Sequence, residues 1–452
     1  MSKPTETPPH RDKQEAAPIT QAAILIFFLP LAASWLLMGV EFPVIVAFVT
    51  RLPDEVVNIA ALGIVLVLSL WIETPVIGLL STGTTLAKNR QHYLLLRRFT
   101  VHLMIGVTVV HALVAWTPLY WVLMHQVLGV PEAVAEAALP GMRIMTTWSA
   151  AIAWRRFTQG VMIRYQQTWV VGVGTAVRLA TVVIASGAGL ALRLPGVWIG
   201  SIAWVAGVTT EALFVHVAAR RTLRLKFGPG VPSDGEPPLT YGSLCRFHLP
   251  LTLTMMLFFV GPPVIRAAIS RGQDPDPTAT LAAWEAVTLI LFFHRAPALA
   301  LPEAIIALQK NAATARALFR FSIGVGLAAT ASLLAVTLTP LGGVLLTGAL
   351  GVPAHVTEVA VFGLVATLLV PMLSAAQSYY KGLLTAQRLT LVLTWAMVLH
   401  MGCLVGFLAA GRALGWPGVI NAAVSITAAL TIELAYLRTA WTRAARRLSV
   451  PA

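Results

Sequence analysis

The stretch LPLAASWLLMGVEFPVIVAFVTR, from Leu29 to Arg51, is matched 220 residues later by LPLTLTMMLFFVGPPVIRAAISR, from Leu249 to Arg271. The Leu-Pro-Leu start, the Pro-Val-Ile triplet and the closing arginine keep one register. Beyond it the offset becomes 222 and holds for the remaining matches: Lys88-Asn89 with Lys310-Asn311, Gly129-Val130-Pro131 with Gly351-Val352-Pro353, and Pro195-Gly196-Val197 with Pro417-Gly418-Val419. One register across so many matches predicts a chain built from two homologous halves.

The composition excludes an ordinary soluble enzyme. Of the 452 residues, 57% are hydrophobic and only 11% are charged, and the mean hydropathy is +0.79; soluble domains carry about 25% charged residues. Apolar segments lie at 22–50, 57–80, 99–122, 140–163, 169–192, 196–219, 244–270, 278–305, 318–343, 357–384, 389–411 and 417–440. Each is long enough to cross a hydrocarbon core of about 30 Å as a helix.

These segments predict an all-α polytopic membrane protein with twelve transmembrane helices. We expect two parallel six-helix lobes, an N-lobe over 22–219 and a C-lobe over 244–440, arranged as a V around a central cleft. The rest divides into a tail (1–21), a linker (220–243) and a second tail (441–452). Because each half contains an even number of helices, both enter the membrane in the same orientation, which is a transporter architecture.

Basic residues indicate the orientation. With both termini inside, twenty Lys and Arg lie in loops and tails on the cytoplasmic side, against four (Arg51, Arg193, Arg271 and Arg412) on the other. This positive-inside bias predicts a multi-pass protein of the plasma or inner membrane with both ends cytoplasmic. The net charge of +14 is thereby explained by topology and does not indicate nucleic-acid binding.

Enzymatic function is not expected. The sequence contains no HExxH, GxSxG or Walker A pattern, and no predicted extramembrane segment is large enough for a catalytic or ATP-driven domain. We expect no cofactor and no metal site, and a monomer that changes access by rocking one lobe against the other. A channel is the rival within membrane proteins, but a two-fold repeat with kinked equivalent helices favours alternating access.

The repeat separates candidate functional charges from scaffold. Charged residues present in both halves, such as Glu211 and Glu433, are expected to be structural and to lie near the cytoplasmic ends of helices. Charges present in one half only are candidates for function. The predicted substrate-binding residues are Arg266, Arg295, Arg155, Arg156, Arg178 and Lys381, and the predicted coupling or gating residues are Glu41, Glu73 and Glu285.

Physical chemistry assigns these residues two kinds of role. A charge near mid-membrane costs at least about 2.5–3.5 kcal/mol and usually faces a cavity or a partner, so a salt bridge is the structural alternative for each. An arginine facing the cleft would bind a carboxylate or phosphate through its planar fork of donors. Glu41 and Glu73 would either take up a proton or pair with Arg266 or Arg295 when substrate is absent.

Two further expectations concern geometry. Adjacent helical residues point about 100° apart, so Arg155 and Arg156 cannot both face the cleft. Prolines inside the predicted spans remove backbone donors and can kink a helix beside a cavity, although each could equally be a static bend. The predicted hinges are Pro43, Pro75, Pro262, Pro263 and Pro297.

The residues also resemble a known superfamily. The chain resembles the MOP flippases in two features. It has two six-helix halves that each open with an LPL-type helix, and the fourth helix of each half ends in a turn like QGVMIRYQQ (from Gln159) or KGLLTAQRL (from Lys381). This superfamily includes the MATE exporters, the polysaccharide and lipid II flippases and the progressive ankylosis (ANKH) proteins. The similarity implies a coupling carboxylate in the first helix, a role that Glu41 would fill; the seventh helix has no carboxylate, which argues against sodium coupling.

Three stretches are most similar to the ankylosis branch: PPVIRAAISRG from Pro262, EAV from Glu285 and AWRRFTQGVMIRYQQTWVVG from Ala153. That branch implies export of anions such as citrate, pyrophosphate or nucleotides. Two alternatives stay open, a flippase for lipid-linked oligosaccharide precursors and a MATE-type cation or drug–proton antiporter. A lateral groove between the first and eighth helices would favour the flippase.

Overall fold

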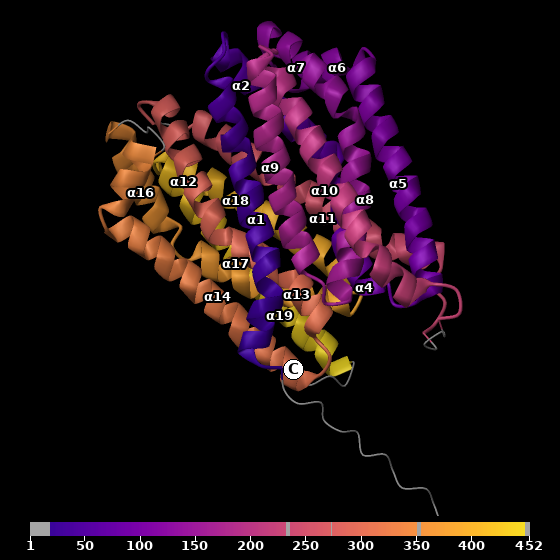
Figure 1. Ribbon diagram of the computed structural model, residues 1–452. Coiled ribbons are helices and arrows are strands. Elements are labelled where there is room, and N and C mark those ends of the chain that lie inside the picture. Colours follow the sequence, from indigo (N-terminus) through magenta and orange to yellow (C-terminus); the bar gives the residue numbers. More distant parts are fainter. Residues whose placement is uncertain (1–18, 232–235, 273, 350–353, 448–452) are drawn as a thin grey trace, which may run out of the picture.

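The computed structural model describes residues 19–231, 236–272, 274–349 and 354–447, and every regular element in these ranges is a helix (Figure 1). The first half comprises α1 (Gln21–Val49), α2 (Glu55–Ile72), α3 (Thr74–Ile77), α4 (Leu79–Leu86), α5 (Arg90–Trp116), the short α6 (Leu119–Trp121) continued by a π-helix (Val122–Val127), α7 (Glu132–Ile144), a 3-10 turn (Met145–Thr147), α8 (Trp148–Arg164), α9 (Trp169–Ala191) and α10 (Gly196–Phe227).

The second half repeats this order. It comprises α11 (Tyr241–Ser270), α12 (Pro277–Leu299), α13 (Leu301–Leu308), α14 (Ala312–Leu338), the short α15 (Leu341–Gly343) continued by a π-helix (Val344–Ala349), α16 (Ala354–Ala366), α17 (Val370–Ala386), α18 (Thr390–Ala413) and α19 (Gly418–Arg447). Even the π-helices are repeated, each directly after the third predicted span of its half.

The helices account for the twelve predicted spans. In the described ranges, ten helices are long and apolar enough to cross a membrane, with α12 and α13 counted as one, and the pair α16–α17, bent by 41°, makes an eleventh. The twelfth segment is α7–α8, which lies at the offset of 222 from α16–α17 and is divided at the same point by its 3-10 turn. The predicted all-α, twelve-segment fold is confirmed.

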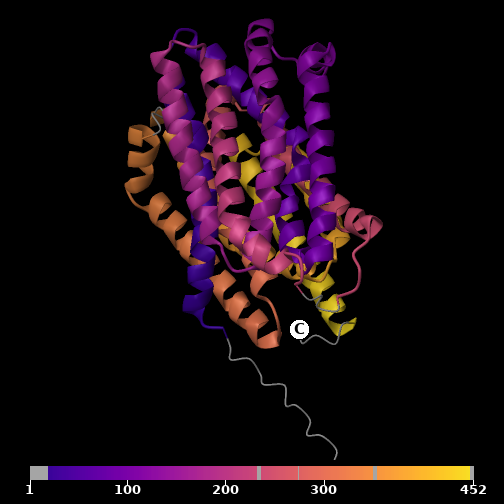
Figure 2. The same cartoon turned by 45° about the vertical axis from the view of Figure 1, so that its right-hand side comes forward.

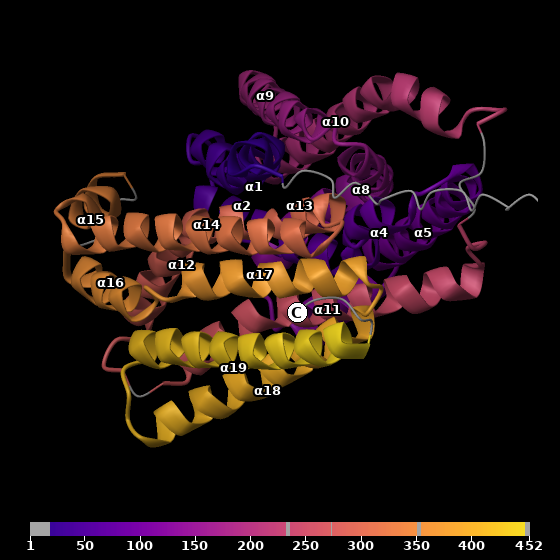
Figure 3. The same ribbon diagram turned by 90° about the horizontal axis from the view of Figure 1, so that it is seen from below.

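The two halves form two lobes. Seen from below, the N-lobe (indigo to magenta) and the C-lobe (salmon to yellow) occupy separate areas (Figure 3), and the N-lobe helices run side by side along most of their length (Figure 2). We call the side on which α1 begins and α19 ends the terminal side. The lobes meet through α1 against α12, α13 and α14, through α3 against α11 and through α4 against α13; α4 and α13 lie at the terminal side (Figure 1).

Helices extend past two of the predicted boundaries. Residues 220–227, expected in the linker, continue α10 as a helix, and α19 runs to Arg447, so most of the expected C-terminal tail is helical. The shortened linker is attached to the N-lobe, because Glu236 pairs with Lys88 Nζ at 2.7 Å and His92 Nε2 lies 3.0 Å from the Pro237 carbonyl oxygen. Residues 1–18 of the predicted N-terminal tail lie outside the described ranges.

The predicted hinge prolines divide into two groups. Pro75 lies in α3, the four-residue helix between two interruptions of the second span, and Pro297 lies one turn before the interruption at Ala300. In contrast, α1 continues through Pro43 and α11 continues through Pro262 and Pro263 without interruption. A hinge role for any of the five stays a prediction; only Pro75 and Pro297 accompany a break.

Within each lobe a glycine lets two helices cross closely. A Cβ atom on Gly160 of α8 would lie 2.3 Å from the Leu80 carbonyl oxygen, and one on Gly382 of α17, its repeat equivalent, would lie 2.8 Å from Ile305 Cβ. The crossings of α4 with α8 and of α13 with α17 therefore depend on these two glycines.

Gly160→Ala should lower the free energy of unfolding by about 1–3 kcal/mol, because the added methyl group meets backbone rather than a mobile side chain. The matched control is Gly106→Ala in α5, where a Cβ atom would have open space around it. Thermal unfolding in detergent measures both; an equal effect of the two substitutions would contradict the close crossing.

Candidate functional site

The centre of the N-lobe holds a buried ionic cluster around Glu211 of α10, which is 0% exposed. Arg155 Nη1 donates to Glu211 Oε2 at 2.8 Å, Gln159 Nε2 donates to Oε1 at 3.0 Å, and the Thr175 hydroxyl donates to Oε1 at 3.2 Å. Arg178 Nη1 lies 3.8 Å from Oε2. Four side chains from α8 and α9 thus neutralise one carboxylate on α10.

Glu41 belongs to the same cluster. Arg178 binds it with two parallel hydrogen bonds, one of 2.8 Å from Nε to Oε1 and a second from Nη2 to Oε2. This bidentate geometry makes a strong, oriented pair, and both side chains are almost fully buried. Glu41 was predicted to pair with Arg266 or Arg295 if it did not carry a proton; in this structure its partner is Arg178, inside the same lobe.

Glu73 is the unusual member. It caps the end of α2, is 0% exposed, and neither carboxylate oxygen has a hydrogen bond of normal geometry among the described residues. The Ser149 hydroxyl is close enough to interact with it, as is the charge of Arg155. An unpartnered buried carboxylate is expensive unless it binds a proton or a cation.

Arg155 and Arg156 point in different directions, as their adjacency predicts. Arg155 is 1% exposed and faces the lobe interior at Glu211. The guanidinium carbon of Arg156 lies 5.9 Å from the ring centroid of Trp35 on α1. The same group interacts electrostatically with Glu303 on α13, a residue of the other lobe. Arg156 has no ion-pair partner in the part of the chain that the structure describes. Because Glu303 belongs to the C-lobe, Arg156 is the member of the pair that faces that lobe.

The C-lobe holds an equivalent cluster around Glu433 of α19, which is 1% exposed. Lys381 Nζ lies 2.7 Å from Glu433 Oε1, His400 Nδ1 lies 3.0 Å from Oε2, and Gln377 Nε2 donates to Oε2 at 3.0 Å. The side chains of Lys381 and His400 are 25% and 12% exposed, so this cluster is more open than the one in the N-lobe.

The two clusters correspond position by position. At the offset of 222, Glu211 matches Glu433, and the surrounding residues match as Arg155 with Gln377, Gln159 with Lys381, and Arg178 with His400. Both glutamates lie in the middle of their helices, so the prediction that they sit near cytoplasmic ends is wrong. The sequence signal for these two residues is an acid kept in both halves within an apolar helix. A filter based on the repeat misses it, because it assigns residues present in both halves to the scaffold.

Arg295 and Arg266 have different environments. Arg295 of α12 donates from Nε to the Ser374 hydroxyl at 3.0 Å and has no carboxylate partner within the described ranges. Arg266 of α11 makes two hydrogen bonds to Glu285 of α12, one of them 2.9 Å from Nη2 to Oε2, and both side chains are 44% exposed. The predicted substrate contact Arg266 and the predicted gating residue Glu285 thus form one pair.

Polar contacts between the lobes lie toward the terminal side. His248 of α11 is placed 2.9 Å from the Thr82 hydroxyl and 2.6 Å from the Pro75 carbonyl oxygen of the N-lobe. The Ser81 hydroxyl donates to Glu303 Oε1 at 3.1 Å. Sequence reasoning singled out neither His248 nor Glu303.

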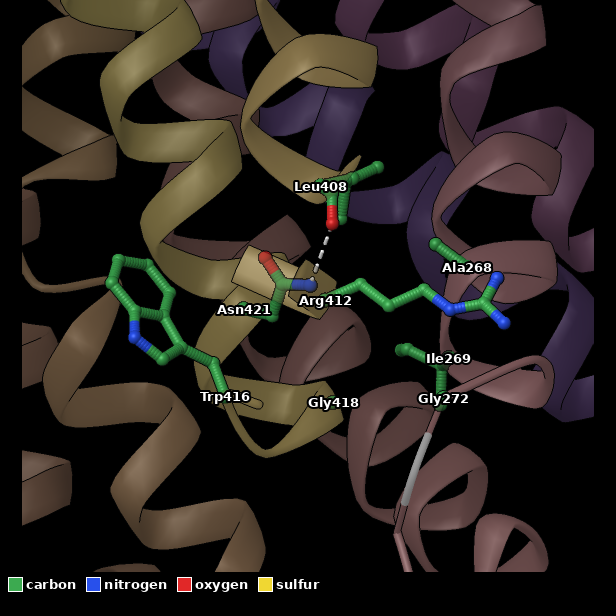
Figure 4. A pocket seen from close by; sticks show the side chains of 8 residues that line it. All are labelled: Ala268, Ile269, Gly272, Leu408, Arg412, Trp416, Gly418 and Asn421. Carbon is green, nitrogen blue, oxygen red and sulfur yellow. Dashed lines mark hydrogen bonds between the residues drawn. The ribbon is translucent and has the colours of Figure 1, made fainter. Parts of the chain in front are cut away.

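Two of the cavities among the described residues lie in the C-lobe. One of about 10 Å³, room for roughly one water molecule, is lined by Ala268, Ile269, Gly272, Leu408, Arg412, Trp416, Gly418 and Asn421 (Figure 4). The other, an open groove of about 350 Å³, is lined by Ala366 and the α19 residues Val424, Thr427, Ala428, Thr431 and Ile432. Neither includes a predicted substrate or coupling residue, so the basic central cleft stays a prediction. The described residues include no group of three or more potential metal ligands.

Comparison with known proteins identifies the fold. The chain is similar to a MOP superfamily transporter from Pyrococcus furiosus, described as having a binding pocket of reverse polarity that suggests a different function (15% identity, TM-score 0.72, covering 93% of this chain and 95% of that one). It is similar to an outward-facing multidrug resistance MATE family transporter (13%, 0.75, 94% and 96%) and to a MATE in the straight conformation (14%, 0.71, 94% and 96%).

This is a polytopic helical membrane protein with the fold of the MATE transporters of the MOP superfamily. No family model matches the sequence, and no curated protein matches it. The predicted likeness to MOP transporters is confirmed for the fold; the ankylosis branch is not confirmed.

The different surroundings of the adjacent arginines predict different effects on stability. Arg155→Gln breaks the buried ion pair with Glu211 and should lower the free energy of unfolding by about 3–5 kcal/mol. Arg156→Gln breaks no ion pair and should cost less than about 1.5 kcal/mol. Unfolding in mixed detergent micelles measures both variants, and equal losses would show that the two guanidinium groups have the same structural role.

Proposed function

We propose that this protein is a secondary active transporter that exports small anions by alternating access between its two lobes. The observation that carries the proposal is a pair of arginines, Arg156 and Arg295, one on each lobe, that lack a carboxylate partner in the described ranges while the other arginines of the two clusters have one. The MATE-type fold supports transport as the class of activity.

Arg156 approaches α1 from the N-lobe, and α12, the helix that carries Arg295, packs against α1 from the C-lobe. Arg156 approaches Trp35, and Gly39, one turn further along α1, faces Phe292 of α12, whose ring atom Cε1 lies 2.4 Å from the position of a Cβ atom on Gly39. Residues four apart on a helix lie on one face. Arg295 is three residues beyond Phe292 on α12, within one turn of the point where α12 meets α1, and its Nε is bonded to Ser374 of α17.

Charge and geometry favour an anion. A guanidinium group in a low-dielectric region is costly without an anion beside it, and its fork of donors fits carboxylate and phosphate oxygens. Citrate, pyrophosphate and nucleotides all offer such groups. That a MOP transporter from P. furiosus is described as having a pocket of reverse polarity supports the idea that this fold accepts pockets of different charge.

The position of the interlobe contacts supports alternating access. The contacts of His248 and Glu303 hold the lobes together toward the terminal side. If the termini are cytoplasmic, as the distribution of basic residues predicts, this arrangement closes the cytoplasmic side. The likeness to an outward-facing MATE transporter agrees with that interpretation.

The lipid-linked flippase is the less favoured alternative. Such a substrate needs a lateral opening between the first and eighth spans, whereas α1 packs against α12 of the eighth span, and three contacts join it to the C-lobe, two to α14 and one to α12. These are Gln21 Nε2 with the Ala317 carbonyl oxygen at 2.9 Å, Phe28 with Phe321 at a centroid distance of 5.1 Å, and Gly39 with Phe292. The cation–proton antiporter would need several acids free to bind a cation, and Glu41 and Glu211 are occupied by arginines, which leaves Glu73 as the one acid of the N-lobe cluster without an ion pair among the described residues.

Proton coupling falls to Glu73 in this proposal. Glu41 forms a bidentate pair with Arg178, and protonation would break that pair. Glu73 has no partner of that kind, so it can bind and release a proton without losing an ion pair. Its position between α2 and α3, at an interruption of the second span, would link its protonation to the shape of that span.

Inside-out vesicles should take up citrate, pyrophosphate or ATP, and a proton gradient should change the rate. Arg295→Ala and Arg156→Gln should each lower uptake about tenfold or more, because a hydrogen bond to a charged group contributes about 1.5–3 kcal/mol. Arg316→Gln, an exposed arginine of α14, is the control for the loss of one positive charge and should leave uptake unchanged.

Ethidium serves as the cationic probe in the same vesicles. Uptake of ethidium without any anion would establish the drug antiporter instead and make both arginines structural. Unchanged anion uptake in both Arg295→Ala and Arg156→Gln would remove the central observation of the proposal.

A further inference from the structure

We infer that the anion-binding subsite lies inside the C-lobe, where Arg295, Lys381 and His400 surround Glu433, and that Glu433 is the internal anion with which the substrate competes for Lys381. This inference rests on the proposed anion transport and assigns it to one lobe. The ligand class is a compact anion with several oxygens, such as pyrophosphate or a polycarboxylate.

The charge balance of the two clusters supports the C-lobe. In the N-lobe three arginines (155, 156 and 178) accompany three glutamates (41, 73 and 211), so the cluster is balanced when all are ionised. In the C-lobe Glu433 is the one carboxylate of its cluster among the described residues, against Arg295 and Lys381, and the cluster is positive even when His400 is neutral. The reversal between Glu73 and Arg295, which are repeat equivalents, by itself makes the C-lobe more positive by two charges, and the loss of arginines at the other equivalent positions offsets part of this.

Accessibility supports the same lobe. The paired side chains of the N-lobe are at most 7% exposed, whereas Lys381 is 25% exposed and His400 is 12% exposed. An anion could therefore reach the amino group of Lys381 without dismantling buried pairs. In the N-lobe the same step would require breaking the bidentate pair between Arg178 and Glu41.

The geometry provides a converging set of donors. Ser374, Gln377 and Lys381 are spaced three and four residues apart on α17 and thus form one face of that helix. Arg295 reaches this face from α12 through its 3.0 Å bond to Ser374, and Glu433 and His400 reach it from α19 and α18. Only Nε of Arg295 is used in this bond, so the two terminal nitrogens of the fork are left for a ligand.

Competition with Glu433 gives the subsite a distinctive behaviour. Without substrate, Lys381 pairs with Glu433 at 2.7 Å; an anion bound by Arg295 and Lys381 would replace that carboxylate as the partner of the amino group. Gln377 and His400 would continue to bind Glu433 through its other oxygen, so no buried charge is stranded in the exchange.

The test is pyrophosphate binding to the purified full-length protein, by calorimetry and by the shift in its thermal unfolding, together with uptake in vesicles. Lys381→Gln, which installs the residue found at the equivalent N-lobe position, should weaken binding about tenfold or more. Lys381→Arg should retain it. Glu433→Gln should bind pyrophosphate more tightly than the wild type, since the competing charge is gone.

Two controls separate the possible failures. Arg316→Gln, exposed on α14, should match the wild type in binding and uptake, and the unfolding temperature without ligand identifies any variant that has lost its fold. The opposite signs expected for Lys381→Gln and Glu433→Gln distinguish charge competition from a structural role, because a purely structural cluster would be weakened by both.

The subsite is overturned if Lys381→Gln binds normally, or if Glu433→Gln weakens binding as much as Lys381→Gln does. A different outcome is that Arg156→Gln loses uptake while Lys381→Gln keeps normal binding and uptake. The proposed anion transport would then stand, but the anion-binding site would lie outside the C-lobe. Absence of anion binding and uptake in the wild type would instead end the proposed function itself.

Discussion

A buried carboxylate at the same place in each half is the constraint on which this structure depends. Glu211 and Glu433 lie in the middle of the last helix of their lobes and are at most 1% exposed. An isolated carboxylate in a medium of low dielectric is very costly, so neighbouring helices must supply donors. Donors from α8 and α9 in the N-lobe, and from α17 and α18 in the C-lobe, thereby fix how three helices of each lobe are rotated toward one another.

The repeat preserves this acid and varies what surrounds it. Positions equivalent to Arg155, Gln159 and Arg178 are occupied by Gln377, Lys381 and His400, so each lobe meets the same requirement with a different set of donors. In the N-lobe, two arginines bind Glu41 and Glu211 in one closed network. In the C-lobe, Lys381 binds Glu433 together with Gln377 and His400. Duplication thus supplied two scaffolds, and divergence at a few positions made one of them more open and more basic.

The fold could be predicted from the sequence because its determinants are long and periodic. Twelve apolar segments and one repeat register are repeated signals, and the described helices follow them closely, except that α10 runs to Phe227 and α19 to Arg447. A hydropathy pattern assigns polar helix ends such as 220–227 to a linker, although these residues include no helix breaker. The polar composition of a helix end does not mark where the helix stops.

The site could be predicted in part only. Charges such as Glu41, Glu73 and Arg178 were identified as unusual inside apolar helices, and Arg155 and Arg156 were expected to diverge by about 100° because they are adjacent. Which partner each charge takes is a property of the packing: Glu41 meets Arg178, 137 residues away, and sequence spacing contains no information on that distance. Glu211 differs from these residues, because a filter based on the repeat assigns an acid present in both halves to the scaffold.

The contacts between the lobes show how such a molecule can be stable in one state and still change. Ser81 and Glu303 are equivalent at the offset of 222, and they touch each other at 3.1 Å. Two equivalent positions can meet only near the axis that relates the halves, so α4 and α13 cross close to that axis. The bonds of His248 to Thr82 and to the Pro75 carbonyl oxygen lie between α11 and the helices α3 and α4. Water can replace each of those bonds at a small net cost, because a typical hydrogen bond contributes only about 0.5–1.5 kcal/mol. The ion pairs of the two clusters each lie within one lobe, so opening the terminal side separates none of them. What must break are a few hydrogen bonds and the apolar packing along α1.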